Sequence, residues 1–126
     1  MTLKEKLDSI RIALDADVLG TDIESVVDKG KALAQLIGLS AECKAEARQK
    51  LEKARVIEFA SLTGKKITPS ILIKLVDAGC ADQIKDLEYA DRLNAGITHQ
   101  LDFYRSVISL HKTEIENSLK AISQTR

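Results

Sequence analysis

The two histidines of the chain each precede a carboxylate by three residues, a spacing that places both side chains on one face of a helix. His99 is followed by Asp102, and His111 is followed by Glu114. Such pairs occur in carboxylate metal sites of helix bundles, but those sites place the glutamate before the histidine and need further glutamates from facing helices. We therefore expect no metal site, because hydrogen bonding on a helix surface explains both pairs better.

A glycine turn and two cysteines are the other candidates for chemistry. The segment 63–66, Thr-Gly-Lys-Lys, lacks the first glycine and the preceding strand of a phosphate-binding loop. Cys43 and Cys80 have neither the C-x-x-C spacing nor a zinc-ligand spacing, so we expect two buried, small apolar side chains. No Ser/His/Asp arrangement follows from the spacing. The sequence thus predicts a protein that is not an enzyme and that uses no cofactor and no small-molecule substrate.

Basic side chains gather in the middle of a chain whose net charge is zero. Residues 44–74 carry eight Lys or Arg side chains and three Glu, whereas the segments 1–30 and 77–91 are acidic. Such bands suit solvated helix faces with local ion pairs, contacts between copies, or contact with phosphate groups. Single-strand binding usually adds aromatic stacking platforms. Only Phe59 lies within the band, and we expect it in the core.

Composition and periodicity predict an all-α helical bundle. Apolar residues make up 44% of the chain and aromatic residues 3%, there is one Pro, and no two-residue alternation persists. The length suits a single domain over residues 1–126. No segment approaches 18 uncharged apolar residues, and Met1 to Lys6 are too charged for a signal peptide, so we expect a cytoplasmic protein without a membrane span.

Glycines and capping residues divide the chain into five predicted helices. Gly20 separates two helices of an N-terminal hairpin, the second of which opens on a capping box of Thr21 and Glu24. Ser40 is a suitable N-cap for the next helix, and Thr68-Pro69 opens a short one. The predicted segments are a helical hairpin over 1–38, a basic helix over 40–64, a short helix over 68–79 and a long helix over 80–124.

The last predicted helix carries apolar residues at heptad spacing for about five heptads. A helix of this length measures about 60 Å, whereas a compact domain of this size measures only about 35–40 Å across. We therefore expect an oligomer, unless the helix kinks at 94–96 or is the buried centre of a monomeric bundle. Polar Asn94 and His111 would fix the register of the seam. The predicted oligomer interface comprises Asn94, Ile97, Leu101, Phe103, Tyr104, Val107, Ile108, Leu110 and His111.

A pattern over residues 41–119 resembles the phage recombination mediator family of the UvsY type. A helix rich in Ala, Lys and Arg (Lys53-Ala54-Arg55) runs through Phe59 to the turn Thr63-Gly64-Lys65, and the long helix carries Asp91 early and Leu101-Asp102-Phe103 in its middle. The resemblance implies an all-helical protein in the host cytoplasm that forms a ring through its long helix. It also implies binding of single-stranded DNA and help in loading a recombinase. The candidate DNA-facing residues are Arg48, from the basic band, and Lys53, Arg55, Lys65 and Lys66, from the resemblance.

Two functional hypotheses follow. The first is a non-catalytic oligomeric mediator that binds single-stranded DNA and a recombination protein. The second is a helical adaptor, assembly factor or inhibitor that docks on a partner protein without nucleic acid.

Overall fold

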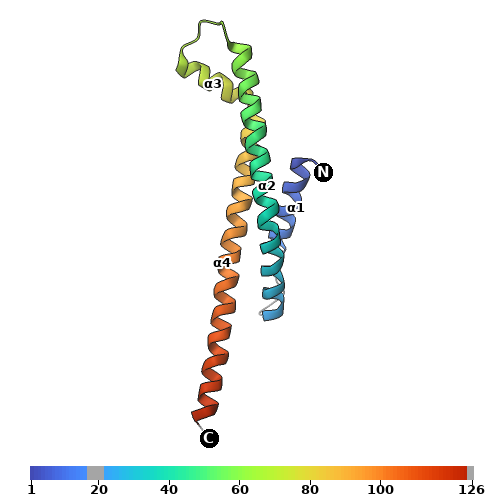
Figure 1. Ribbon diagram of the computed structural model, residues 1–126, viewed down its shortest axis with the longest axis vertical. Helices are drawn as coiled ribbons and strands as arrows, with labels where there is room; N and C mark the ends of the chain where they lie inside the picture. Colours follow the sequence, from blue (N-terminus) through green and yellow to red (C-terminus); the bar gives the residue numbers. More distant parts are fainter. Residues whose placement is uncertain (17–21, 125–126) are drawn as a thin grey trace.

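The computed structural model describes residues 1–16 and 22–124, and it is a helical bundle drawn out into a rod (Figure 1). Four helices follow one another in the described residues: α1 (Leu3–Asp15), α2 (Ile23–Leu62), α3 (Pro69–Gly79) and α4 (Ala81–Gln124). The two long helices, α2 and α4, lie antiparallel; α1 packs beside them and α3 folds back at one end. The prediction of an all-α bundle with a long C-terminal helix is confirmed.

Helix α2 runs without a break through the boundary that the sequence predicted near Gly38 and Ser40. The division into a hairpin over 1–38 and a separate helix over 40–64 was therefore wrong. Glycine inside a helix costs about 1 kcal/mol relative to alanine. That cost is outweighed here, because Leu33 and Cys43 on either side are buried in the core. Ser40 is not a cap but a buried side chain whose hydroxyl accepts a hydrogen bond from Asn94 Nδ2 at 3.1 Å.

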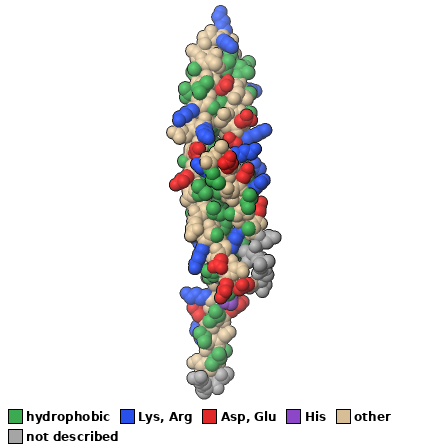
Figure 2. Space-filling model, turned by 90° about the vertical axis from the view of Figure 1, so that its right-hand side faces the viewer, with side chains coloured by type: hydrophobic (Ala, Val, Ile, Leu, Met, Phe, Trp, Pro, Cys, Tyr) green, Lys and Arg blue, Asp and Glu red, His purple; other side chains and the backbone are tan. Residues whose placement is uncertain are grey.

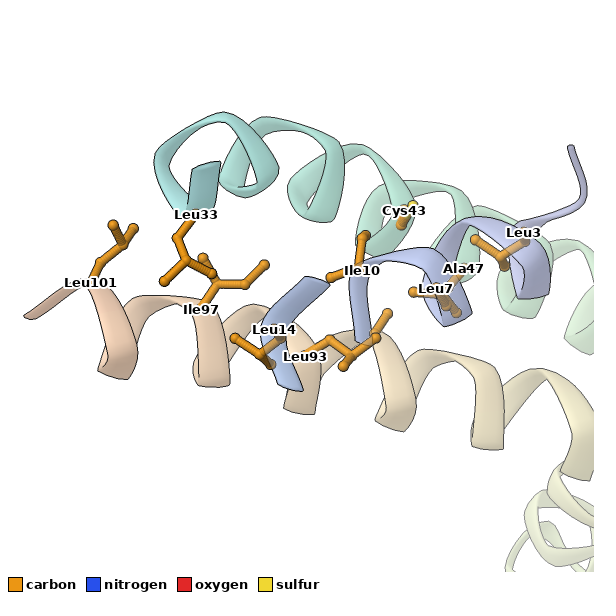
Figure 3. Close-up of a cluster of buried hydrophobic side chains, with 11 residues drawn as sticks. Leu3, Leu7, Ile10, Leu14, Leu33, Cys43, Ala47, Leu93, Ile97 and Leu101 are labelled. Atoms are coloured by element: carbon orange, nitrogen blue, oxygen red, sulfur yellow. The ribbon is translucent and has the colours of Figure 1, made fainter. Parts of the chain in front are cut away.

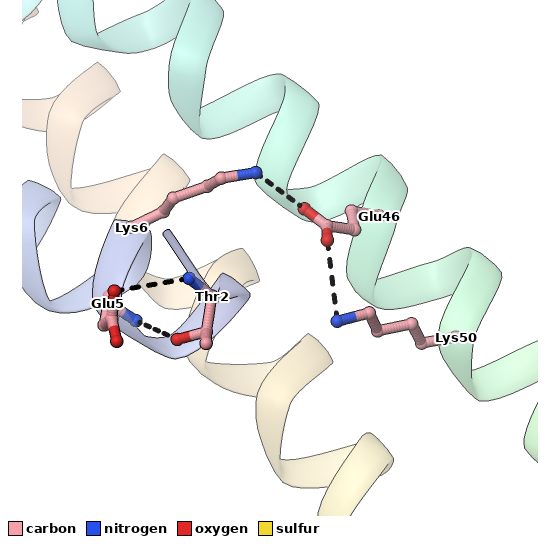
Figure 4. A network of polar contacts seen from close by, with 5 residues as sticks. All are labelled: Thr2, Glu5, Lys6, Glu46 and Lys50. Carbon is pink, nitrogen blue, oxygen red and sulfur yellow. Dashed lines mark hydrogen bonds and ion pairs between the residues drawn. The ribbon is translucent and has the colours of Figure 1, made fainter.

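The starts of the first two helices follow local capping signals. The Thr2 hydroxyl accepts a hydrogen bond from the Glu5 amide while the Glu5 carboxylate accepts one from the Thr2 amide, which completes a capping box (Figure 4). Asp22 is the N-cap of α2 and accepts from the amide of Glu24. The expected N-cap, Thr21, was the wrong residue for this role; Gly20 and Thr21 lie outside the described residues.

The turn between α2 and α3 has the features that the sequence predicted. Gly64 follows the end of α2 with a φ of 88°, a backbone conformation that suits glycine. Thr68 is the N-cap of α3, Pro69 occupies the first turn, and Gly79 is its last residue.

The main core lies where α1 packs into the groove between α2 and α4 (Figure 3). Helix α1 contributes one stripe at steps of three and four residues, and the long helices contribute the facing stripes. Burying a large aliphatic side chain contributes about 1.5–3 kcal/mol. The buried residues are Leu3, Leu7, Ile10 and Leu14 from α1, Leu33, Cys43 and Ala47 from α2, and Ala90, Leu93, Ile97 and Leu101 from α4.

Polar contacts also hold α1 in this groove. The Lys29 ammonium donates to the carbonyl oxygens of Ala13, Leu14 and Ala16, which lie at the end of α1 where backbone acceptors lack helical partners. Gln100 Nε2 donates to the Leu14 carbonyl from the α4 side at 3.1 Å. The end of α1 is thus bound by side chains from both long helices.

An ion pair joins α1 to the middle of α2 (Figure 4). The Lys6 ammonium donates to Glu46 Oε2 at 3.3 Å, and Lys50 lies 3.5 Å from the other carboxylate oxygen. The hydrogen bond from Lys6, with the charges of both lysines, lowers the pKa of Glu46. The resulting stabilisation is present above the pKa of the unfolded carboxyl and is lost as the pH falls through the folded value. It is small, because both side chains are about one-third exposed.

A second, smaller core lies at the end of the rod that α3 closes. Its buried members are Leu51 of α2, Val76 of α3 and Cys80, which directly precedes α4. Leu87 packs against both cores and connects them.

Helix α4 is continuous through residues 94–96, where a kink was the alternative that the sequence allowed. Gly96 lies where α1 packs close to α4: a Cβ atom placed on it would meet Leu14 Cδ2 at 2.9 Å. The weak helix former at this position therefore makes room for α1.

Candidate protein-interaction surfaces

Large apolar side chains remain exposed at both ends of the rod. We call residues 52–77, which comprise the end of α2, the following turn and most of α3, the tip; we call residues 109–124 of α4 the α4 extension. In Figure 2 hydrophobic side chains reach the surface towards both ends, including the narrow lower end that α4 forms. The exposed set comprises Val56, Ile57, Phe59, Ile71, Ile73 and Leu75 in the tip and Leu110, Ile115, Leu119 and Ile122 in the α4 extension.

The α4 extension continues the core-facing stripe of α4 beyond the start of α2. Ile97 and Leu101 are buried, and Ile108 lines a groove with Val27 near the start of α2. Ile115 falls on the same stripe one heptad after Ile108 but is 48% exposed. Figure 1 shows the C-terminal part of α4 running well past the start of α2. The described helices α1–α3 therefore leave this part of the stripe uncovered.

The predicted interface residues divide into three groups. Asn94, Ile97 and Leu101 serve the chain's own core: Asn94 donates to Ser40 of α2, and the two aliphatic residues are buried. Tyr104, Val107, Ile108 and His111 are half-buried, and Tyr104 and Ile108 line a groove beside the start of α2. Phe103 and Leu110 are exposed. Contact with another copy stays a prediction for the last two groups, whereas the first group already packs within the chain.

A groove of about 270 Å³ lies between the end of α2 and α3. Arg55 Nε lies 3.4 Å from Asp77 Oδ1, which joins the two helices by an ion pair beside this groove. Phe59, which we expected in the core, lines the groove and is 54% exposed. The groove lining comprises Arg55, Phe59, Leu72, Ile73, Val76 and Asp77.

A second apolar surface of the tip lies on α2. Val56 and Ile57 line it together with Glu52 and Lys53. These residues and the exposed residues of α3 were not among the predicted site residues. The sequence of α3 did contain a signal for exposed apolar side chains. Ile71, Leu72 and Ile73 are consecutive, so their side chains point in different directions around the helix and cannot all face one core.

The structure does not gather the candidate DNA-facing residues into one patch. Lys65 and Lys66 are exposed in the turn that ends the rod. Lys53 lies beside Val56 and Ile57, and Arg55 is paired with Asp77. Arg48 is exposed on α2. It precedes the last residue of that helix by 14 residues and therefore lies about 20 Å from the turn.

The His, Cys, Asp and Glu side chains of the described residues form no cluster that could hold a metal ion. His99 is exposed and His111 half-buried. A hollow of about 600 Å³ lies between the start of α1 and α4 and is lined by charges of both signs: Lys4, Lys85, Arg92, Asp82, Asp86 and Glu88, with Tyr89. Within the described ranges, no helix has the length and apolar character needed to span a bilayer.

Both cysteines are buried free thiols, as the sequence predicted. Burial raises the pKa of Cys43 and of Cys80, so the thiolate that attacks disulfide reagents is disfavoured at neutral pH. We expect the native protein to react slowly with dithiobis-nitrobenzoate and both thiols to react at once after denaturation. A Ser109→Cys variant, whose added thiol lies on an exposed face of α4, supplies the fast-reacting control. Rapid modification of either native cysteine would contradict this expectation.

Comparison of the chain with family models, with curated proteins and with solved structures finds no match. The structure alone therefore defines the class: an all-helical rod with a three-helix core along part of its length and exposed apolar side chains at both ends.

Proposed function

We propose that this protein is a non-catalytic helical assembly protein that joins protein chains through the apolar surfaces of the tip and the α4 extension. The observation that supports this proposal is the placement of large exposed apolar side chains outside both cores, at the two ends of the rod. Contiguous exposed apolar surface marks sites of protein interaction in folded proteins. The cytoplasmic location expected from the sequence is part of the proposal.

Light scattering over a range of concentrations tests the proposal. We expect a mass above the 13.8 kDa of one chain, and we expect the double variant Phe59→Asp/Ile115→Asp to be monomeric while it keeps its helical circular dichroism. A wild-type chain that is monomeric up to millimolar concentration would contradict assembly between copies.

A second candidate function is the binding of single-stranded DNA at the tip. It is favoured by one observation: Phe59 is exposed at the end of the rod where Lys65 and Lys66 occupy the turn. A mediator related to the UvsY type would use this end for the nucleic acid. An aromatic ring near lysines can stack on a base while the ammonium groups neutralise phosphates. The zero net charge of the chain and the aliphatic side chains around Phe59 favour the protein-binding function instead.

Charge reversal in the turn tests the second candidate. If single-stranded DNA binds there, Lys65→Glu/Lys66→Glu will weaken binding of a labelled oligonucleotide and reduce the slope of log affinity against log salt by about 1.4, because two phosphate contacts are lost. Fluorescence anisotropy at low salt measures both quantities. Lys112→Glu/Lys120→Glu, which makes the same change of net charge on the α4 extension, is the matched control. The absence of binding by the wild-type chain at low salt would exclude this function.

A further inference from the structure

We infer that a groove between the start of α2 and α4 binds an acidic amphipathic helix of a partner protein. We call it the open groove; its volume is about 210 Å³, and it is separate from the tip and from the α4 extension. Its uncharged lining residues are Val27, Gly30 and Ala34 of α2 and Leu101, Tyr104 and Ile108 of α4. The open groove is thus a third surface, which does not depend on the two surfaces of the proposed assembly function.

The open groove lies on the side of the α2–α4 pair that faces away from α1. On the near side, Lys29 of α2 and Gln100 of α4 both donate to the Leu14 carbonyl at the end of α1. Lys31 follows Lys29 by two residues and so points about 200° further round α2, while Arg105 follows Gln100 by five residues and points about 140° further round α4. Lys31 and Arg105 line the open groove, and among the described residues none of α1 does. The same two helices therefore hold a helix on one side and present a groove on the other.

The size and setting of the open groove suit the side chains of a helix. Small-molecule sites are typically clefts of about 300–1,000 Å³, which is larger than this groove. A Cβ atom placed on Gly30 would have no heavy atom within 4 Å, so a docked helix can approach α2 closely there. An amphipathic helix in such a groove is anchored by apolar side chains at positions i, i+3, i+4 and i+7. Placed opposite α1, it completes a four-helix bundle with α1, α2 and α4.

The charges of the open groove select an acidic partner. Lys31 stands on the α2 wall and Arg105 on the α4 wall, both are exposed, and within the described residues no carboxylate lines the groove. Arg105 Nη1 lies 3.8 Å from Asp102 Oδ1 of its own helix, but both side chains are at least about two-thirds exposed, so this pair contributes little. In the groove at the tip, by contrast, Arg55 is matched by Asp77. A helix whose apolar residues are flanked by carboxylates matches both cations, whereas a basic helix meets like charges.

Two synthetic peptides test the choice of an acidic partner. Each has about 14 residues, or four helical turns, with the same leucines and alanines on one face and either Glu or Lys at the flanking positions. In fluorescence anisotropy at low salt, we expect the Glu peptide to bind about tenfold more tightly than the Lys peptide, and Lys31→Glu/Arg105→Glu to reverse this preference. Lys65→Glu/Lys66→Glu makes the same change of net charge in the exposed turn at the other end of α2 and is the matched control, which keeps the wild-type preference.

Three outcomes of this experiment overturn the inference. The first is no binding of the Glu peptide to the wild-type chain at millimolar concentration. The second is a preference for the Glu peptide that Lys31→Glu/Arg105→Glu does not reverse. The third is a wild-type chain that self-associates and becomes monomeric with Lys31→Glu/Arg105→Glu, because the open groove then binds a second copy.

Gly30→Leu tests the position of the site. Leucine is a better helix former than glycine and meets open space here, so we expect this variant to unfold at a temperature no lower than the wild type. We expect it to lose binding of the Glu peptide, because its side chain fills the open groove. A Gly30→Leu chain that binds the Glu peptide as tightly as the wild type overturns the inference. Phe59→Asp/Ile115→Asp leaves the open groove intact and is expected to bind the peptide normally, so the two proposals can fail separately.

Discussion

Replacement of Ile97 by alanine is expected to lower the free energy of unfolding by about 2–5 kcal/mol, the range for removing a large aliphatic side chain from a packed core. Ile97 is 0% exposed and lies in the core that α1, α2 and α4 form together (Figure 3). Its truncation removes buried apolar surface and leaves a cavity that three helices would have to close. Urea denaturation followed by circular dichroism measures the change, and the m-value is expected to stay constant.

Ile115→Ala is the matched control for this prediction. Ile115 lies on the same stripe of the same helix, but outside the region that α1 and α2 cover. At concentrations where the chain is monomeric, its truncation is expected to change stability by less than about 0.5 kcal/mol, as for surface substitutions in general. Equal losses for the two variants would mean that the α4 extension is covered within the chain, contrary to the structure.

Enlargement of Gly96 is expected to displace α1. A leucine at this position must share space with Leu14, whose Cδ2 already lies 2.9 Å from the site of a new Cβ atom. Overpacking of this kind typically costs about 1–3 kcal/mol. We expect Gly96→Leu to lower the midpoint of thermal unfolding and to speed trypsin cleavage at the basic residues of α1.

Two variants separate crowding from the effect of removing a glycine. Gly96→Ala is expected to be close to neutral, because a gain of about 1 kcal/mol in helix propensity offsets the movement of one flexible leucine. Gly38→Leu adds the same side chain where nothing lies within 4 Å of the new Cβ atom, and we expect it to stabilise the protein. If Gly96→Leu were as stable as Gly38→Leu, the close approach of α1 would be contradicted.

The fold class and α4 follow from the sequence because both depend on local signals. The heptad spacing of α4 predicts its length, and Gly64 and Thr68-Pro69 predict the turn before α3. The break at Gly38 was predicted wrongly because the continuity of α2 depends on packing against distant residues: Ser40 is held by Asn94, 54 positions away. Local propensity does not contain this information.

The candidate sites were harder to predict, for a related reason. Periodicity identifies an apolar stripe but not how far along it a neighbouring helix reaches. Because α2 is one long helix, it covers α4 as far as Ile108, and Ile97 and Leu101 are buried within the chain. Phe59 and Ile73 are exposed because α3 is short and buries only part of its apolar surface against α2 and α4.

The smaller core also affects how the tip moves. Only Leu51, Val76 and Cys80 are buried there, whereas the main core buries eleven residues drawn from three helices. Segments with few buried apolar contacts open by local unfolding at a lower free energy than the rest of a protein. We therefore expect α3 to open at a lower free energy than the three-helix region. In the proposed assembly function, this lower stability would let the groove beside Phe59 adapt its shape to a partner chain.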